Sequence, residues 1–429
     1  MDKSSKFLLT IVLLFLLCII GASAGGLTYV VKLLEQSYVD PNYNAVLNKT
    51  SDQEGYCLTD LVDEYDITFS SISDLYKEAC VSVVASIEGS ENAYLGSGVC
   101  IASKDYETES GEKIDDGSYI VTNHHVFEEC YQDPKFQLHV YPNDYLNVQR
   151  YGVLNYYEAE ILWTDSYLDM AIIYINENID WVRMKDRTIM CSDEDMLKAE
   201  ENLFAIGTPQ SLSYQNTVTK GHMASETITY TYTIQDGEYI NEVLDNVYEY
   251  LIPINISIMG GNSGGGLFDS EGFLIGQPTL GVQDSQDVDA INYSIPIYTA
   301  IQVLDDLIIS NEDALSEIKI YGLNDLNFKT IDIYESEIMQ TQFTGLKRSF
   351  YGEYYTLEDL TYNENGLKII SSLNSKLKKG DIIIGAQLNE KTTEINCRND
   401  LIFVLLKARQ GDTITFDLLE KDDVSLVLA

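Results

Sequence analysis

The chain has 429 residues, of which 45% are hydrophobic and 22% are charged, a mixture typical of globular proteins. At about 100–200 residues per domain, this length predicts two or three domains. The 27 Lys and Arg residues against 68 Asp and Glu residues give a net charge of −41. Such acidity argues against nucleic acid as a partner, because phosphate binding needs Lys and Arg. With four histidines and no HExxH, paired CxxC or EF-hand motif, we expect neither a bound metal nor a cofactor.

An uncharged segment lies close to the N-terminus. Lys3 and Lys6 precede residues 7–31, which carry no charge, and about 20 apolar residues suffice to cross a bilayer. The lysines favour a cytoplasmic N-terminus. We therefore expect residues 1–31 to be a cytoplasmic stub and a single-pass transmembrane anchor in the cell membrane, with the rest of the chain outside. The alternative is secretion after cleavage, since residues 22–24 read Ala-Ser-Ala.

Cysteine usage agrees with export but does not define a disulfide framework. Cys18 lies in the apolar segment, and six further cysteines follow it. Outside the cytoplasm disulfides can persist, although six cysteines allow 15 complete pairings. Buried free thiols remain an equally good interpretation.

The pattern of strands and helices divides the chain into regions. Residues 32–71 are polar and acidic and are expected to form a linker. Residues 72–310 are mainly β, with short strands bounded by turns and a closing helix over 299–308. The predicted strands are 80–87, 98–102, 119–122, 137–141, 160–163 and 170–175. Residues 311–340 are expected to be a connector, and 341–429 a smaller α+β unit with a helix near 399–407 and a strand near 413–419.

A glycine-rich turn carries the strongest chemical signal. In the segment 260–267, two glycines precede Asn262, Ser263 follows it, and three glycines come directly after Ser263. Glycine allows close approach of a substrate, and the N–H groups of such a turn can face a developing oxyanion. The segment also fits G-x-S-x-G, the nucleophile elbow of the α/β-hydrolase fold. That fold requires a histidine after the serine, and every histidine of this chain precedes Ser263. The order His, Asp, Ser remains available.

A base and an acid for Ser263 are found upstream. His124 and His125 follow the apolar strand 119–122, and Asp169 begins the apolar strand 170–175. A buried carboxylate at that position needs a hydrogen-bonding partner, which an imidazole N–H would supply. We expect His125 to be the base, Asp169 to orient it, and Ser263 to be the nucleophile.

Together these motifs resemble those of the HtrA/Deg-type trypsin-like serine proteases. They occur in the family order over about 220 residues and read Gly96-Ser97-Gly98-Val99, Val121-Thr122-Asn123-His124-His125-Val126, Asp169-Met170-Ala171-Ile172, Ala205-Ile206-Gly207-Thr208-Pro209, Gly261–Leu267 and Tyr293-Ser294-Ile295-Pro296. The resemblance implies a chymotrypsin-like double β-barrel with the site in the cleft between barrels. It places the catalytic residues at His125, Asp169 and Ser263, and the oxyanion hole at the N–H groups of Gly261 and Ser263 with Asn262.

The smaller C-terminal unit resembles a PDZ domain. The match is 377–383, with 366–370 upstream, and the carboxylate-binding loop would be Phe343-Thr344-Gly345-Leu346. In such a loop, backbone N–H groups bind a peptide C-terminus by strand addition. The alternative is a β-rich accessory domain that binds no peptide.

The resemblance as a whole implies an ATP-independent serine endopeptidase. Its substrates would be unfolded or misfolded exported proteins, in protein quality control at the cell envelope, and it would form a homotrimer. The alternative is a membrane-tethered chaperone or PDZ-type adaptor with a latent or inactive protease domain. A narrow-specificity peptidase for acidic side chains is disfavoured, because a chain with a charge of −41 has few cations to build such a pocket.

Overall fold

The computed structural model describes most of the chain in several stretches. These are residues 55–142, 155–185, 197–224, 251–281, 292–309, 321–335 and 366–428, with gaps at 91, 109, 167, 199 and 322, and the short pieces 42, 45–46, 187, 232–233, 247–248, 348–350, 353–355 and 361–362. The segment 7–31 and the loop Phe343–Leu346 lie outside the described residues. No helix among the described residues is long and apolar enough to span a membrane.

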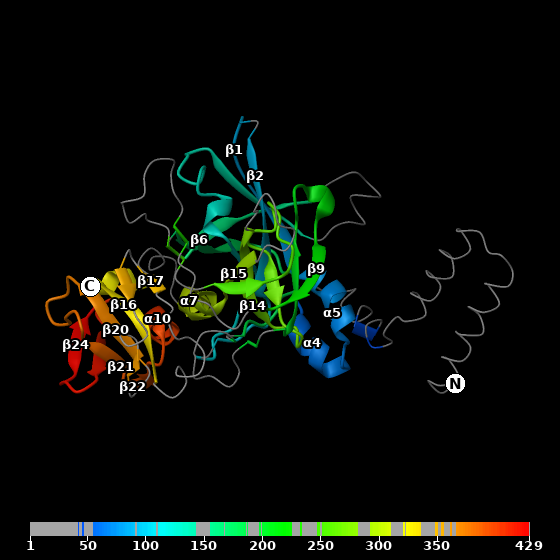
Figure 1. Ribbon diagram of the computed structural model, residues 1–429. Coiled ribbons are helices and arrows are strands. Elements are labelled where there is room, and N and C mark those ends of the chain that lie inside the picture. Colours follow the sequence, from blue (N-terminus) through cyan, green and yellow to red (C-terminus); the bar gives the residue numbers. More distant parts are fainter. Residues whose placement is uncertain are drawn as a thin grey trace, which may run out of the picture.

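A seven-stranded antiparallel sheet forms the first half of the larger domain (Figure 1). Its order is β5-β4-β1-β2-β3-β7-β6. The strands are β1 (Cys80–Ile87), β2 (Ala93–Ala102), β3 (Ser118–Thr122), β4 (Phe136–Tyr141), β5 (Tyr157–Glu158), β6 (Glu160–Asp165) and β7 (Met170–Ile175). All six strands expected in this region are confirmed, and a 3₁₀ helix η2 (His124–Val126) follows β3.

A six-stranded sheet forms the second half, in the order β12-β15-β14-β13-β8-β9. Its strands are β8 (Asn202–Gly207), β9 (Thr217–His222), β12 (Ile252–Ile254), β13 (Gly266–Phe268), β14 (Leu274–Gly281) and β15 (Asn292–Pro296). A separate two-stranded piece consists of β10 (Tyr232–Thr233) and β11 (Val247–Tyr248). The two sheets are half-barrels that fit the chymotrypsin-like fold, so the mainly β prediction is confirmed.

Alternation along the strands explains how each sheet buries both faces. In β3 and β7, Ile120 and Ile173 lie in a cluster inside the first sheet, whereas Val121 and Ile172 belong to the large central cluster. Successive strand residues point to opposite faces, so an uninterrupted apolar run is buried on both. A third cluster, which includes Leu203 within β8, fills the second sheet.

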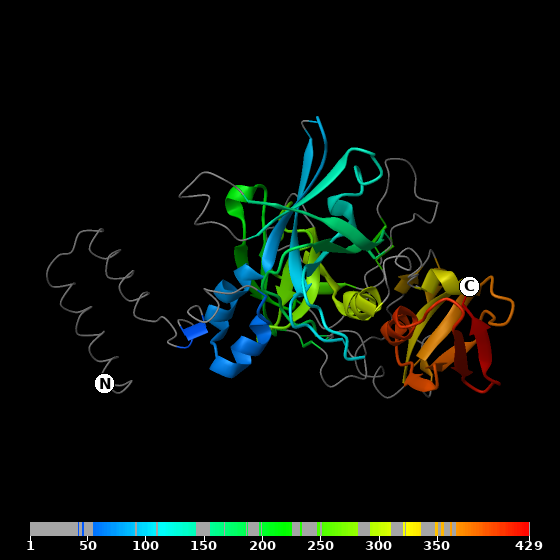
Figure 2. The same ribbon diagram turned by 180° about the vertical axis from the view of Figure 1, so that it is seen from behind.

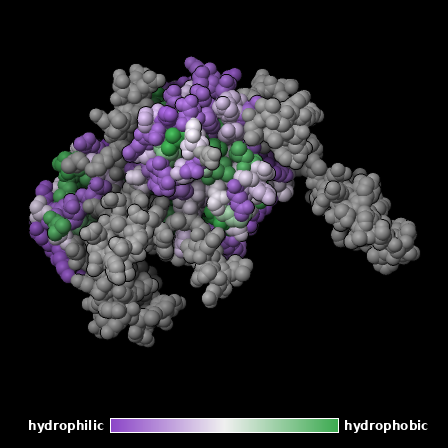
Figure 3. All heavy atoms as spheres, turned by 90° about the horizontal axis from the view of Figure 1, so that it is seen from above, coloured by the Kyte–Doolittle hydropathy of each residue, from purple (hydrophilic) through white to green (hydrophobic). Residues whose placement is uncertain are grey.

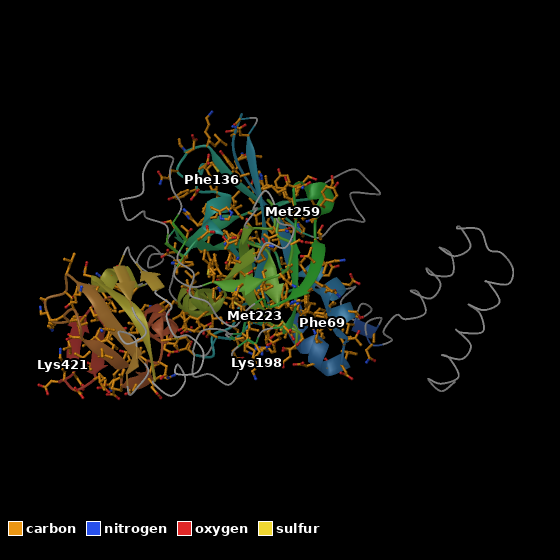
Figure 4. The ribbon with its side chains drawn as sticks, viewed as in Figure 1. Phe69, Phe136, Lys198, Met223, Met259 and Lys421 are labelled. Carbon is orange, nitrogen blue, oxygen red and sulfur yellow. The ribbon has the colours of Figure 1, made fainter. Side chains whose placement is uncertain are left out.

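Two short helices cover the second sheet where a linker was expected. Helix α4 (Leu58–Tyr65) and helix α5 (Phe69–Leu75) are followed by the 3₁₀ helix η1 (Tyr76–Glu78). Phe69, the first residue of α5, packs edge-on against Phe204 with ring centroids 5.5 Å apart, and Figure 4 labels it where α5 lies beside the sheet. The polar composition of 32–71 concealed these apolar anchors, and residues 58–75 are an integral part of the domain.

The C-terminal domain contains a third sheet. Its order is β19-β16-β20-β21-β23-β24, with β22 paired to β21. Its elements are η5 (Leu323–Leu326), β16 (Phe328–Glu335), β19 (Thr361–Tyr362), β20 (Gly366–Ser372), β21 (Ile382–Leu388), β22 (Lys391–Glu394), α10 (Arg398–Leu406), β23 (Thr413–Leu418) and β24 (Val424–Val427), beside a hairpin of β17 (Arg348–Phe350) and β18 (Glu353–Tyr355). Strand β16 pairs with β20, so part of the expected connector belongs to this sheet.

Helix α7 (Tyr298–Ile309) joins the two domains. Tyr298 packs against Phe403 of α10 with centroids 4.7 Å apart, and Arg409 pairs with Asp306 at 2.7 Å. Figures 1 and 2 show the C-terminal domain on the α7 side of the larger domain and α4 and α5 on the opposite side. Hydrophilic side chains cover much of the described surface seen from above, with apolar patches between them (Figure 3).

The cysteines differ in state. Cys57, Cys80, Cys100 and Cys130 are free thiols, whereas Cys397 is disulfide-bonded. Burial raises the pKa of Cys57 to about 12. Burial also raises the pKa of the thiols of Cys80, Cys100 and Cys130. None of these four free cysteines is therefore suited to nucleophilic chemistry.

Candidate active site

His125 and Asp169 meet at the ends of two neighbouring strands. His125 lies in η2 directly after β3, and Asp169 precedes β7, which pairs with β3. Asp169 has a φ of 52°, a conformation that only a tight turn normally imposes. This turn directs the carboxylate back toward the end of β3. His125 Nδ1 lies 2.7 Å from Asp169 Oδ2.

The Asp169 carboxylate is buried and receives three hydrogen-bond contacts. Besides the ring of His125, the backbone N–H of His125 donates to Oδ1 at 2.8 Å, and the hydroxyl of Thr279 donates to Oδ2 at 2.8 Å. Asp169 itself is 2% exposed. A carboxylate beside Nδ1 favours the tautomer with the proton on Nδ1. His125 Nε2 is then left with a lone pair, as a general base requires.

The pKa of His125 is raised above its ordinary value. Burial works in the opposite direction, but the hydrogen bond and charge of Asp169 outweigh it, with a further contribution from Glu128. The carboxylate thus stabilises the imidazolium that would form when His125 takes up a proton.

The neighbouring histidine has a different environment. His124 is 5% exposed, its Nδ1 lies 2.7 Å from the Thr164 hydroxyl, and its ring packs edge-on against Phe127 and Tyr131. Burial lowers the pKa of His124, despite the charges of Asp169 and Glu128. His124 is therefore a packed side chain whose surroundings favour the neutral form, whereas the side chain of His125 is 37% exposed.

The loop of Ser263 lies against the strand that leads to His125. Gly264 has a φ of 81°, and a Cβ there would lie 2.3 Å from Ser97 O, 2.4 Å from Thr122 Oγ1 and 2.9 Å from Asn123 N. Only glycine allows this approach. A Cβ on Gly96 would likewise touch both Val126 and the Ser263 carbonyl. The segments that carry His125 and Ser263 are therefore in direct contact. Met259, labelled in Figure 4, begins the turn that leads into this loop.

Four consecutive carbonyl groups of the serine loop accept hydrogen bonds. The donors are Gln210 N to Gly260 O (2.7 Å), Ser97 Oγ to Gly261 O (2.7 Å), Gly265 N to Asn262 O (2.9 Å) and Ser97 N to Ser263 O (2.8 Å). Each peptide plane of the loop is consequently held in one orientation. A carbonyl fixed on one side of a peptide directs the following N–H to the other side.

The amide groups of the same loop fall into two sets. Asn262 N donates to Met259 O at 2.9 Å, and Gly264 N donates to Pro278 O at 3.2 Å. Within the part of the chain that the structure describes, the N–H groups of Gly261 and Ser263 donate to no protein acceptor. The backbone N–H of Asn262, expected to contribute to an oxyanion hole, is thus already occupied. The N–H groups of Gly261 and Ser263 remain available.

Three residues support the site through contacts that the sequence did not predict. Ser97 contacts the serine loop through both its backbone and its hydroxyl. Thr279 contacts Asp169, and Gln277 Nε2 donates to Gly264 O at 3.2 Å. Ser97 stands in the motif Gly96-Ser97-Gly98-Val99, which gave it no role. Nothing in the local sequence marks Thr279 or Gln277, and the partners of all three are distant in the chain. Among the described residues, no cluster of His, Cys, Asp or Glu could hold a metal ion.

Comparisons with known proteins agree with this geometry. The model of the trypsin-like peptidase domain matches residues 96–276. The serine protease Do-like HtrA of Bacillus subtilis is 24% identical over 359 residues, which cover 82% of this chain and 70% of the relative. The resemblance to HtrA-type serine proteases is confirmed, and the chain is a serine-type endopeptidase.

Two further similarities concern parts of the peptidase or its fold alone. The probable periplasmic serine endoprotease DegP-like of Chlamydia muridarum is 29% identical over 200 residues, 46% of this peptidase and 33% of that relative. A solved structure of the HtrA-type protease AlgW with tripeptide matches with a TM-score of 0.50 and 19% identity, covering 84% of this chain and 95% of that one. The structural match supports the same arrangement of elements.

Proposed function

We propose that the peptidase cleaves polypeptides with His125, Asp169 and Ser263 as a catalytic triad. The observation that carries the proposal is the buried Asp169 carboxylate, 2.7 Å from the ring of a partly exposed His125. The contact between the segments of His125 and Ser263 supports it further. A carboxylate so placed has a defined task in acyl transfer, because it fixes the base and stabilises its protonated form.

The proposed reaction proceeds in two steps. His125 Nε2 takes the proton of Ser263 Oγ while Oγ forms a bond to the peptide carbonyl carbon. The N–H groups of Gly261 and Ser263 stabilise the resulting oxyanion, and His125 then passes its proton to the leaving amine as the C–N bond breaks. Water, activated by the same histidine, hydrolyses the acyl-enzyme. Removing one oxyanion donor typically costs about 10²–10³-fold in kcat.

We further propose that the substrates are unfolded or misfolded exported proteins, cleaved without ATP. One relative is named a periplasmic endoprotease, and the uncharged segment 7–31 is long enough to anchor the chain in a membrane. Assembly into a homotrimer, protein quality control at the envelope, and binding of peptide C-termini by a PDZ-like C-terminal domain at Phe343–Leu346 belong to the same proposal. They rest on the resemblance to HtrA-type proteases.

Hydrolysis of an unfolded protein tests the proposal. Full-length wild type and Ser263→Ala would be incubated with casein and with a natively folded protein, and the products mapped by mass spectrometry. We expect cleavage of casein by wild type only, with the folded protein spared. Equal hydrolysis by both variants would overturn the assignment of Ser263. Absence of cleavage, combined with suppression of aggregation, would favour the latent chaperone.

A further inference from the structure

A chain of buried hydroxyl groups crosses from the first sheet to the serine loop. Ser82 Oγ lies 2.7 Å from Thr208 Oγ1, Thr208 N donates to Ser97 Oγ at 2.8 Å, and Ser97 Oγ lies 2.7 Å from Gly261 O. The exposed fractions are 0% for Ser82, 0% for Thr208 and 1% for Ser97. We call these three side chains the hydroxyl chain. Ser82 and Ser97 lie on β1 and β2, and Thr208 directly follows β8, so the hydroxyl chain connects both half-barrels.

The hydroxyl of Ser97 has a defined direction. Because it accepts the N–H of Thr208, its own proton is directed to Gly261 O. This hydrogen bond is partly buried, so a Gly261 carbonyl without its donor would bear part of the penalty of about 1–3 kcal/mol that a fully buried polar group carries. The Gly261–Asn262 peptide is held at both of its polar groups, by the Ser97 hydroxyl at Gly261 O and by the hydrogen bond from Asn262 N to Met259 O. Glycine at Gly261, with a φ of 97°, offers little resistance of its own to rotation.

The same hydroxyl also supports the preceding peptide. Thr208, whose N–H it binds, begins the short segment that ends at Gln210, and Gln210 N donates to Gly260 O at 2.7 Å. Gln210 has a φ of 64°, an unusual backbone conformation that its surroundings must maintain. The Gly260–Gly261 peptide carries the Gly261 N–H, one of the two available N–H groups. Ser97 Oγ contacts the peptide that follows it, at Gly261 O, and through Thr208 it supports the segment whose Gln210 N contacts Gly260 O.

We propose that Ser97 is a positioning residue whose hydroxyl keeps the Gly261 N–H directed at the oxyanion. This inference rests on the proposed function of the Ser263 loop. Its action is confined to the hydroxyl, because the backbone bonds of Ser97 to Ser263 O and Thr122 Oγ1 do not depend on the side chain. A group that acts on the transition state alone lowers kcat and leaves KM nearly unchanged.

The test compares Ser97→Ala with a buried serine of the same region. Ser103 is 0% exposed and hydrogen-bonded to Ser118 Oγ and Gly117 O, remote from the serine loop. For the full chain and a peptide substrate, we expect Ser97→Ala to lower kcat about 10–10²-fold with KM changed less than about twofold. Ser103→Ala should keep the wild-type kcat, although its unfolding midpoint in urea should fall by about as much as that of Ser97→Ala.

Binding of a peptide aldehyde supplies the second readout. The adduct of the aldehyde with Ser263 carries the oxygen that the oxyanion site must hold. Ser97→Ala should therefore lower the affinity for the aldehyde by about the factor lost in kcat. Should Ser97→Ala not fold, Ser97→Cys replaces it, because a thiol is of similar size and a weak donor.

Four results would contradict the proposal. A kcat for Ser97→Ala no lower than that of Ser103→Ala, or a change confined to KM, would overturn the role of Ser97 while leaving the triad intact. Unchanged affinity for the aldehyde would do the same. A wild type no more active than Ser263→Ala would instead overturn the proposed function, and this inference with it.

Discussion

The two halves of the active site are built in different ways. Around His125 and Asp169 the decisive contacts join side chains, namely an imidazole, a carboxylate and the hydroxyl of Thr279. Around Ser263 they join mostly main-chain groups, with four carbonyls occupied and two N–H groups left available among the described residues. The first half therefore depends on which residues are present, and the second on how the backbone is held.

The largest expected effect separates the two adjacent histidines. His125→Ala removes the base and should lower kcat by about 10⁶-fold, the order of magnitude known for loss of a triad histidine. His124→Ala should change kcat less than about tenfold, because its ring contacts Thr164, Phe127 and Tyr131. Its cost should appear as a lower unfolding midpoint in urea. Comparable kcat values for the two variants would contradict the assignment of the base.

Replacing the acid tests the side-chain half further. Asp169→Asn should lower kcat by about 10⁴-fold, because the amide no longer selects the Nδ1 tautomer. The pH profile should move as well. His125 must be neutral to accept a proton, and its pKa is raised in the native protein. Wild-type kcat/KM should thus rise with pH through a midpoint above about 6.5, and Asp169→Asn should shift that midpoint to lower pH. An unshifted midpoint would show that Asp169 does not act on His125.

The main-chain half can be broken at a glycine. Gly264→Ala would place a Cβ 2.3 Å from Ser97 O, so the loop must move, and we expect kcat to fall by about 10²–10³-fold, as for a lost oxyanion donor. Gly89→Ala is the matched control, since Gly89 has a φ of 83° but nothing within 4 Å of the added Cβ. That variant should lose about 1 kcal/mol of stability from backbone strain and keep its kcat. Similar kcat losses in both would mean that strain, and not the contact, is responsible.

The smallest expected effect concerns the third contact of Asp169. Thr279→Val removes one hydrogen bond to the carboxylate and should lower kcat about tenfold, which corresponds to the lower end of the range of about 1.5–3 kcal/mol for a hydrogen bond to a charged group. Thr59→Val is a suitable control, because Thr59 is also buried and hydrogen-bonded but contacts Tyr76 and Arg183. A kcat for Thr279→Val equal to that of Thr59→Val would remove Thr279 from the catalytic account.

The contrast between the halves also explains what could be predicted from the sequence. His125 and Asp169 stand at the ends of apolar strands, and short apolar runs bounded by turns located those strands well. Thr279 escaped notice because its contact with Asp169 spans 110 positions of the chain. Helix α4 was missed because the polar composition around it hid the apolar face of Leu58, Leu61 and Val62. Strand β16 was missed because its place in the sheet depends on pairing with β20, which no local pattern records.

Covalent labelling of Ser263 tests the central claim most directly. A fluorophosphonate reacts with a serine that a neighbouring base has activated, and peptide mapping identifies the modified residue. We predict a single label on Ser263 in wild type and in His124→Ala, at similar rates, and none on the same timescale in His125→Ala. Labelling of Ser263 at the wild-type rate in His125→Ala, or a label on another serine, would contradict the proposed triad.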